Sequence, residues 1–163
     1  DIPQTGHSIE LRICAEDATA DFRPSIGNIL LLDEPRGEGV RVDSGILDGG
    51  KVTTDFDPML SKLIVHGSDR AQAIARARHA VQNYVILGVT TNTGYLDAIL
   101  AHPDFASGDV STGFLAEQAD ALTAPGENVD DLLMAVAALS DERLVAEVMQ
   151  ISDMHRKMGG WRN

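Results

Sequence analysis

The segment Gly6–Asp17, GHSIELRICAED, places an arginine and a glutamate among apolar residues that recur at every second position. In a β-strand, this spacing puts the apolar side chains on one face and those of Glu10 and Arg12 together on the other. A guanidinium is permanently cationic and carries a rigid set of hydrogen-bond donors, which suits it to hold an oxyanion. Arg12 is therefore a candidate catalytic residue. The pattern is equally compatible with a surface ion pair between Arg12 and Glu10.

A second pair of ionisable residues, Asp55 and Asp57, lies immediately before Pro58. Two neighbouring carboxyl groups can perform acid–base chemistry when their environments separate their pKa values. An aspartate ahead of a proline also commonly begins a turn. Asp57 is therefore a second candidate, and turn initiation is the alternative.

Other sequence motifs that would indicate metal or nucleotide chemistry are absent from the chain. The five histidines form no HExxH pattern and no i,i+4 pair with a carboxylate, so we expect no metal site. The chain has no GxxxxGK[ST] phosphate loop, and Gly37-Glu38-Gly39 lacks the third glycine of a dinucleotide-binding loop.

Composition narrows the class of protein further. The 163 residues are 44% hydrophobic, which is enough for a globular core, and 13 basic against 25 acidic residues give a net charge of -12. This charge repels phosphate backbones and anionic membranes, so we expect no nucleic-acid or membrane partner. The single cysteine, Cys14, and the lack of a signal-peptide pattern favour a cytoplasmic location. The chain begins with Asp1 close to an expected strand, which we interpret as a piece of a longer protein.

The elements that position these residues follow from periodicity and turn signals. Short strands and turns are expected up to about residue 65, and the run Pro58–Val65 fits helix or strand, its second half favouring strand. Helices are expected near 69–83 and 92–101. Strands followed by helices favour an α+β fold, an antiparallel sheet with helices packed on it. Residues 118–128 have the composition of a linker, and 130–149 have high helix propensity.

Taken together, six segments of the chain resemble the C-terminal domain of biotin carboxylase in order and spacing. They are GHSIELRICAED, FRPSIG, GVRVDSG, FDPMLSKLIVHG, DRAQAIARARHAV and GVTTNTGYLDAILAHPDF. The resemblance assigns residues 1–117 to that domain, 118–128 to a linker and 129–163 to the start of the region that follows it in the biotin-containing α subunit of acyl-CoA carboxylases. It implies the biotin carboxylase C-terminal domain fold.

The resemblance also implies an activity. In this family ATP activates bicarbonate, and biotin held on a carrier lysine is then carboxylated. The arginine matched by Arg12 stabilises the enolate of biotin, Asp57 matches an aspartate near the biotin site, and Arg41 matches an arginine at the homodimer interface of some members. Lys157-Met158 is similar to the pair on which biotin is carried, but without the preceding methionine, so a solvated lysine is the favoured interpretation.

The family's ATP-grasp region has no counterpart in this chain. We therefore expect this fragment to bind no cofactor and to be inactive alone, whereas the parent enzyme uses biotin, ATP, Mg²⁺ and bicarbonate. The implied partners are the upstream ATP-grasp region, the biotin carrier domain, a carboxyltransferase subunit and, as in some members of the family, a second copy in a homodimer. The alternative function is a non-catalytic structural or oligomerisation module of a carboxylase assembly.

Overall fold

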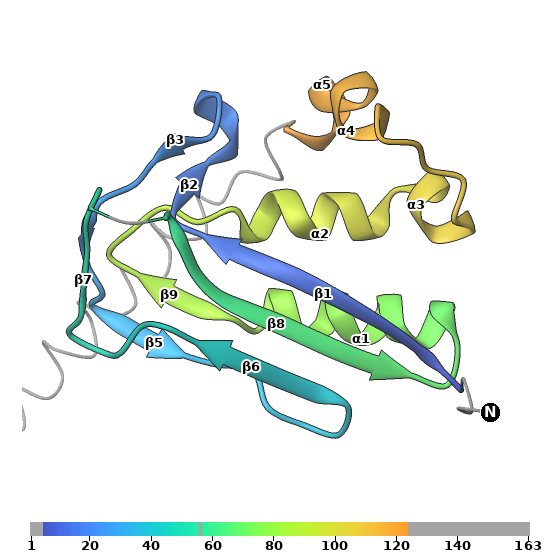
Figure 1. Cartoon of the computed structure of the whole chain (residues 1–163), viewed down its shortest axis with the longest axis horizontal. Helices are drawn as coiled ribbons and strands as arrows, with labels where there is room; N and C mark the ends of the chain where they lie inside the picture. The colour runs from blue at the N-terminus through green and yellow to red at the C-terminus, as the bar shows by residue number, and fades with distance from the viewer. Residues whose placement is uncertain (1–4, 56, 124–163) are drawn as a thin grey trace, which may run out of the picture. The chain divides into compact units, whose positions relative to one another are not determined.

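Figure 1 shows the computed structural model, which describes residues 5–55 and 57–123 of the 163-residue chain. The chain divides into two compact units, Asp1–Ala124 and Pro125–Asn163, and all described residues belong to the first. The region 129–163, which includes Lys157, therefore lies outside the described residues.

Strands occupy most of the N-terminal half and helices most of the rest (Figure 1). The strands are β1 (His7–Cys14), β2 (Glu16–Asp17), β3 (Arg23–Pro24), β4 (Gly27–Asn28), β5 (Leu31–Asp33), β6 (Val40–Ser44), β7 (Lys51–Val52), β8 (Met59–Gly67) and β9 (Val85–Leu87). The helices are α1 (Arg70–Gln82), α2 (Thr93–Ala101), α3 (Pro103–Ser107), α4 (Phe114–Glu117) and α5 (Ala119–Leu122), and a short 3-10 helix covers Ala18–Ala20.

The centre of the fold is an antiparallel three-stranded sheet in the order β1-β8-β6. The prediction that Ile9, Leu11 and Ile13 share a face is confirmed, since all three are buried while Glu10 and Arg12 are exposed. The segment Pro58–Val65, ambiguous by periodicity, is strand from Met59 onward. Helix α1 packs against the apolar face of the sheet, which leaves the other face to solvent (Figure 1).

Further antiparallel pairs flank this sheet. Within the described residues, β2 pairs with β3, β4 with β7, and β5 with β9. The α+β class predicted from sequence is confirmed, with several small sheets in place of one continuous sheet. Gly88, the residue after β9, lies against the backbone of β4: its φ is +106°, and a Cβ there would lie 1.9 Å from the carbonyl oxygen of Asn28, so the position requires glycine.

Helix α1 begins at the position that the sequence pattern predicted, directly after Asp69. The Asp69 side chain accepts a hydrogen bond from the backbone N–H of Gln72 at 2.8 Å, which caps the helix. The predicted core residues of this region are buried, at Ile74, Ala77, Val81 and Tyr84. Helix α2 buries Leu100, but Leu96 and Ile99 are only partly covered.

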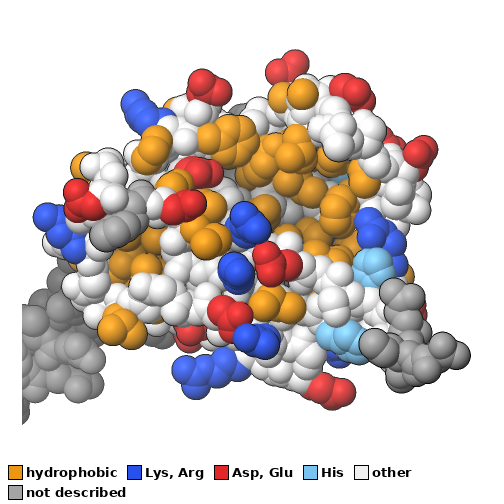
Figure 2. Space-filling view, viewed as in Figure 1, with side chains coloured by type: hydrophobic (Ala, Val, Ile, Leu, Met, Phe, Trp, Pro, Cys, Tyr) orange, Lys and Arg blue, Asp and Glu red, His pale blue; other side chains and the backbone are white. Residues whose placement is uncertain are grey.

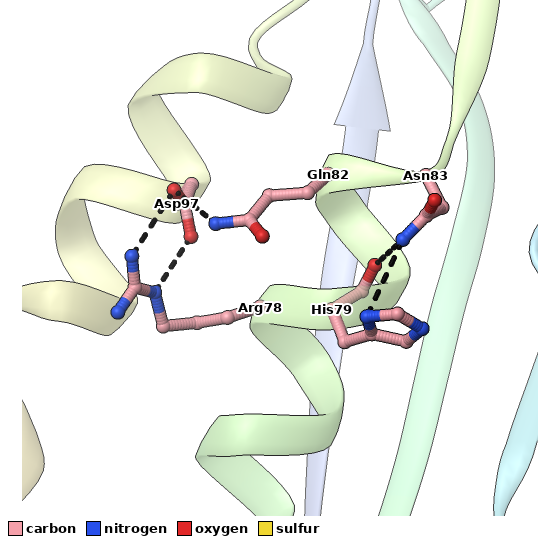
Figure 3. A network of polar contacts seen from close by, with 5 residues as sticks. All are labelled: Arg78, His79, Gln82, Asn83 and Asp97. Carbon is pink, nitrogen blue, oxygen red and sulfur yellow. Dashed lines mark hydrogen bonds and ion pairs between the residues drawn. The ribbon is translucent and has the colours of Figure 1, made fainter.

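An ion pair joins α1 to α2 (Figure 3). The Arg78 guanidinium donates from Nε to Oδ1 of Asp97 at 2.8 Å and from Nη2 to Oδ2 at 3.4 Å, and Gln82 donates to the same carboxylate at 3.0 Å. Burial by itself raises the pKa of the Asp97 carboxyl, but these hydrogen bonds and the charge of Arg78 outweigh it and leave that pKa below its usual value. The two helices are thus fixed to each other by charge as well as by apolar packing.

Within the described residues, the chain after α2 continues in three short helices, one of which lies in the range that composition assigned to a linker. Helix α3 begins at Pro103, a residue well suited to the first turn because it needs no backbone N–H partner there. Helix α5 falls within the range 118–128 that composition assigned to a linker, and its Leu122 is buried. Burial of one apolar side chain thus extends the packed part of the chain beyond residue 117.

Candidate functional site

The exposed face of the β1-β8-β6 sheet carries Arg12. Antiparallel register places Arg12, Lys62 and Asp43 in one row across the three strands. The next row consists of Glu10, Ile64 and Arg41. Figure 2 shows side chains of both charges gathered over these strands, near the middle of the view, and apolar side chains over α2 above them. Side chains from three separate segments of sequence therefore share this surface.

Arg12 is accessible and weakly held. Its side chain is 69% exposed, and its one ion pair among the described residues joins Nε to Oε1 of Glu10 at 3.5 Å. An exposed pair at this distance contributes little to stability. The ion pair with Glu10 therefore forms, and the guanidinium stays accessible to a ligand.

Lys62 is the nearest cross-strand neighbour of Arg12 on this face. Directly opposite residues of an antiparallel pair have Cβ atoms about 5 Å apart, so the two cations reinforce each other's potential. Sequence reasoning did not identify Lys62 because its relation to Arg12 depends on strand register. The alternation of Lys62 with the buried Ser61 and Leu63 is the signal that could have placed it on the exposed face.

Asp57 lies where the chain enters β8. Its Oδ1 accepts a hydrogen bond from the backbone N–H of Met59 at 2.8 Å, so it does initiate a turn. Cys14 is the partner of Met59 in the β1-β8 ladder, beside a bulge after Ile13. The structure thus brings the Asp57 turn to the same end of the sheet as Arg12.

Both candidate residues, Asp57 and Arg12, affect the pKa of the Cys14 thiol. Its pKa is raised to about 11, chiefly by burial and further by the carboxylates of Glu16 and Asp57, while the charge of Arg12 acts in the opposite direction. This end of the sheet therefore holds carboxylates and a guanidinium within electrostatic range of one half-buried group.

Arg41 lies on the same face of the sheet as Arg12, but in β6, which is separated from β1 by β8. Its guanidinium donates from Nε and Nη2 to the two carboxylate oxygens of Asp43, at 2.7 and 3.0 Å. This two-point pair raises the pKa of Arg41, through the hydrogen bond to Asp43 first and its charge second. The side chain is 72% exposed, so its outer surface can meet a partner.

A hollow of about 260 Å³ opens beside Lys62 at the ends of β6 and β8. Its lining residues are Asp43, Ser44, Gly45, Met59, Leu60, Ser61 and Lys62. It is open to solvent and lies on the same strands as the row that contains Arg12. The site is thus a charged sheet surface bordered by a shallow hollow.

Within residues 5–55 and 57–123, no three side chains of the metal-ligating types come together to form a metal site. In the same part of the chain, no helix has the length and apolar character needed to cross a membrane.

Comparison with known protein families gives one match, the biotin carboxylase C-terminal domain, over residues 10–117. The chain is 46% identical over 119 residues to the mitochondrial propionyl-CoA carboxylase alpha chain of Mus musculus, covering 72% of this chain and 16% of that protein. It is 38% identical over 146 residues to the mitochondrial methylcrotonoyl-CoA carboxylase subunit alpha of Dictyostelium discoideum, covering 89% of this chain and 21% of that protein.

Solved structures agree with these relatives. The biotin carboxylase domain dimer of 2-oxoglutarate carboxylase from Hydrogenobacter thermophilus, in complex with MgADP, ADP and bicarbonate, superposes with a TM-score of 0.73. It is 36% identical, over 77% of this chain and 28% of that one. The multifunctional pyruvate carboxylase of Rhizobium etli gives a TM-score of 0.74 at 30% identity, over 78% of this chain and 13% of that one. The chain therefore spans a minor part of each protein that it matches.

Proposed function

The chain belongs to the biotin carboxylase C-terminal domain family, and from that premise we propose that Arg12 stabilises the negative charge that develops on biotin during its carboxylation. Biotin, carried on a lysine of a separate carrier domain, supplies the ureido nitrogen that accepts the carboxyl group. The observation that carries the proposal is the position of Arg12: a strand fixes its backbone, and its side chain is 69% exposed beside the cationic Lys62.

The site fits a neutral ring that becomes an anion in the reaction. A preorganised cation aimed at developing charge lowers the barrier more than the same cation in bulk water, because it needs no reorganisation. Lys62 adds a second positive charge directly beside Arg12. The hollow at Lys62 offers space for a group of small-molecule size next to these charges.

Asp57 has a supporting role in this proposal. Its carboxylate is committed to the backbone N–H of Met59, so it shapes the turn that begins β8. We assign it a position at the edge of the biotin site, where it holds the loop that borders the sheet.

ATP, Mg²⁺ and bicarbonate are assigned to the part of the parent enzyme outside this chain. The Hydrogenobacter thermophilus structure that contains MgADP and bicarbonate is matched over only 28% of its length. We infer that the parent is the α subunit of an acyl-CoA carboxylase, as the propionyl-CoA and methylcrotonoyl-CoA relatives are. On this proposal the isolated chain has no turnover until an ATP-grasp region is supplied.

A structural role of the same sheet is the second candidate. The matched Hydrogenobacter thermophilus domain is a dimer, and Arg41 presents a 72% exposed side chain on the open face of β6. We assign Arg41 to a contact with a second copy of the domain. This role and catalysis by Arg12 are compatible.

The test joins the chain to the ATP-grasp region of a biotin carboxylase and measures biotin-dependent ATP cleavage. We expect turnover in the joined protein and none in the chain alone. Arg12→Ala should lower kcat about 100- to 1000-fold, since that is the usual loss when one group that stabilises an oxyanion is removed. Arg12→Lys should recover part of the rate, because it keeps the charge but not the guanidinium fork.

Arg36 provides the matched control, because it is an exposed arginine in the loop after β5, outside the three-stranded sheet. Arg36→Ala changes the net charge equally and should leave kcat within about twofold of the unmodified enzyme. Equal rates for the Arg12 and Arg36 variants would refute the catalytic role. Loss of dimer in Arg41→Ala, with unchanged kcat per subunit, would support the separate structural role.

A further inference from the structure

The end of β1 that carries Arg12 is held by the side chain of Asn92. The backbone N–H of Cys14 donates to Oδ1 of Asn92 at 2.9 Å, and Nδ2 of Asn92 donates to the carbonyl oxygen of Arg12 at 3.1 Å. The backbone N–H of Asn92 also donates to the carbonyl oxygen of Cys14 at 3.1 Å. Asn92 is only 8% exposed, so these bonds are shielded from water.

The chemistry of the partners fixes the orientation of this amide. A backbone N–H can only donate and a carbonyl can only accept, so Oδ1 must face Cys14 and Nδ2 must face Arg12. An aspartate has the same shape but presents no donor to Arg12 when ionised. An alanine keeps neither bond. Asparagine therefore meets both requirements at this position, and its close analogues do not.

Asn92 immediately precedes α2, where an asparagine commonly caps the helix with its side chain. Here the side chain makes no capping hydrogen bond. Its two polar groups instead contact β1, 78 and 80 positions away in sequence. A side-chain cap typically stabilises a helix by about 1 kcal/mol. Helix α2 lacks this stabilisation because the Asn92 side chain bonds to β1 instead.

The strand end needs such a restraint. β1 is an edge strand of the three-stranded sheet, and its pairing with β8 is interrupted by a bulge between Ile13 and Cys14. A bulge leaves the ladder locally broken, directly after the residue next to Arg12. Asn92 bonds to backbone groups on both sides of Ile13, so it spans the irregular position.

The restraint is itself anchored. Asn92 leads into α2, and Asp97 in that helix is bound by Arg78 and Gln82 of α1 (Figure 3). Helix α1 in turn packs against β1 and β8. A continuous series of contacts therefore runs from the helical layer to the backbone of Arg12.

We propose that Asn92 is a positioning residue, which fixes the backbone on either side of Ile13 so that the Arg12 side chain starts from one defined place. This inference rests on the proposed function of Arg12. A displacement of about 1 Å in a catalytic group can cost about 100-fold in rate, so a restraint on its root has a kinetic consequence.

The first arm of the test measures amide hydrogen exchange in the 163-residue chain and needs no activity. Asn92→Ala should speed exchange at the Cys14 amide by about tenfold or more, because the acceptor is lost. Asn92→Asp keeps the acceptor and should change it by less than about threefold. Unchanged Cys14 exchange in Asn92→Ala would overturn the restraint. If Asn92→Ala does not fold, Asn92→Asp and the second arm decide.

The second arm measures kcat and KM for ATP in the chain joined to an ATP-grasp region. Both Asn92 variants should lower kcat about 10- to 100-fold and leave KM for ATP within about twofold, because Arg12 acts only in biotin carboxylation. Asp48→Ala is the matched control: it removes the side-chain acceptor of the backbone N–H of Leu32 in β5, outside the three-stranded sheet, and should leave kcat within about twofold.

Failure of this inference is distinguishable from failure of the proposed function. If Arg12→Ala abolishes turnover while Asn92→Asp retains full kcat, the positioning role is wrong and the role of Arg12 stands. If Arg12→Ala retains full kcat, the proposed function fails, whatever the Asn92 variants do. A kcat that falls equally in Asp48→Ala would show a general loss of stability and would also overturn the inference.

Discussion

Arg12 and Lys62 lie directly opposite each other on the exposed face of the β1-β8 ladder, so two cations stand side by side. The carboxylates nearest to them are already paired, Glu10 with Arg12 and Asp43 with Arg41. No ion pair within the described residues involves Lys62. Like charges in opposed positions oppose folding slightly, and the Lys62 ammonium is not engaged by either of these carboxylates.

Replacing Lys62 with glutamine should therefore separate stability from activity. The free energy of unfolding should change by less than about 0.5 kcal/mol, because the repulsion from Arg12 and the attraction to Asp43, which lies opposite Lys62 on its other side, are lost together. Loss of a partly screened cation beside Arg12 should lower kcat about fivefold in the enzyme joined to an ATP-grasp region, since the lost interaction is worth about 1 kcal/mol. Urea denaturation and steady-state kinetics measure the two effects. A kcat equal to that of the unmodified enzyme would exclude a role for Lys62.

The thiol of Cys14 should be unreactive. Its pKa of about 11, raised mainly by burial, leaves far less thiolate at pH 8 than in a free cysteine, whose pKa is about 8.5. We expect alkylation by iodoacetamide to be about tenfold slower or more than that of free cysteine, even after allowing for the greater nucleophilicity of the high-pKa thiolate. Cys14 is the only cysteine in the chain, so the measured rate refers to one site.

Two substitutions should move this pKa in opposite directions. Asp57→Asn removes a carboxylate that raises the pKa of Cys14 and should lower it, whereas Arg12→Ala removes a charge that lowers it and should raise it. The pH dependence of alkylation in each variant checks the signs. Shifts of the same sign in both variants would contradict the placement of Asp57 and Arg12 about this thiol.

The local sequence pattern predicted those features of the site that depend only on neighbouring residues. The alternation around Arg12 identified its strand and its exposed face, because side-chain direction in a strand has a period of two residues. The register that places Lys62 beside Arg12 joins residues 50 positions apart, and no local pattern encodes it. Asn92 had the residue type and position of an ordinary helix cap, whereas tertiary packing directs its side chain to β1.

The Arg78–Asp97 pair should make stability depend on acid. Because the pKa of Asp97 is lowered in the folded state, its contribution is complete above the unfolded value of about 3.9 and is lost as pH falls through the folded value. Asp97→Asn should reduce the free energy of unfolding by about 1 kcal/mol at pH 7, a modest amount since both side chains are partly exposed.

Urea denaturation at pH 7 and near pH 2 tests this dependence. The difference between Asp97→Asn and the unmodified chain should shrink as the pH falls, because the carboxyl group then takes up a proton. A difference that stays constant between the two pH values would show that Asp97 stabilises the α1–α2 contact by packing alone.

The buried hydrogen bond between Ser61 and Tyr84 should show strong coupling. Their oxygens are 2.8 Å apart beneath the central sheet, and Ser61 and Tyr84 are 3% and 6% exposed. Tyr84→Phe leaves the Ser61 hydroxyl without this partner and should cost about 1–2 kcal/mol. The double variant Ser61→Ala/Tyr84→Phe removes both polar groups, so it should cost less than the sum of the single variants. Urea denaturation of the four proteins gives the coupling energy, and strictly additive costs would contradict a direct bond between the two hydroxyls.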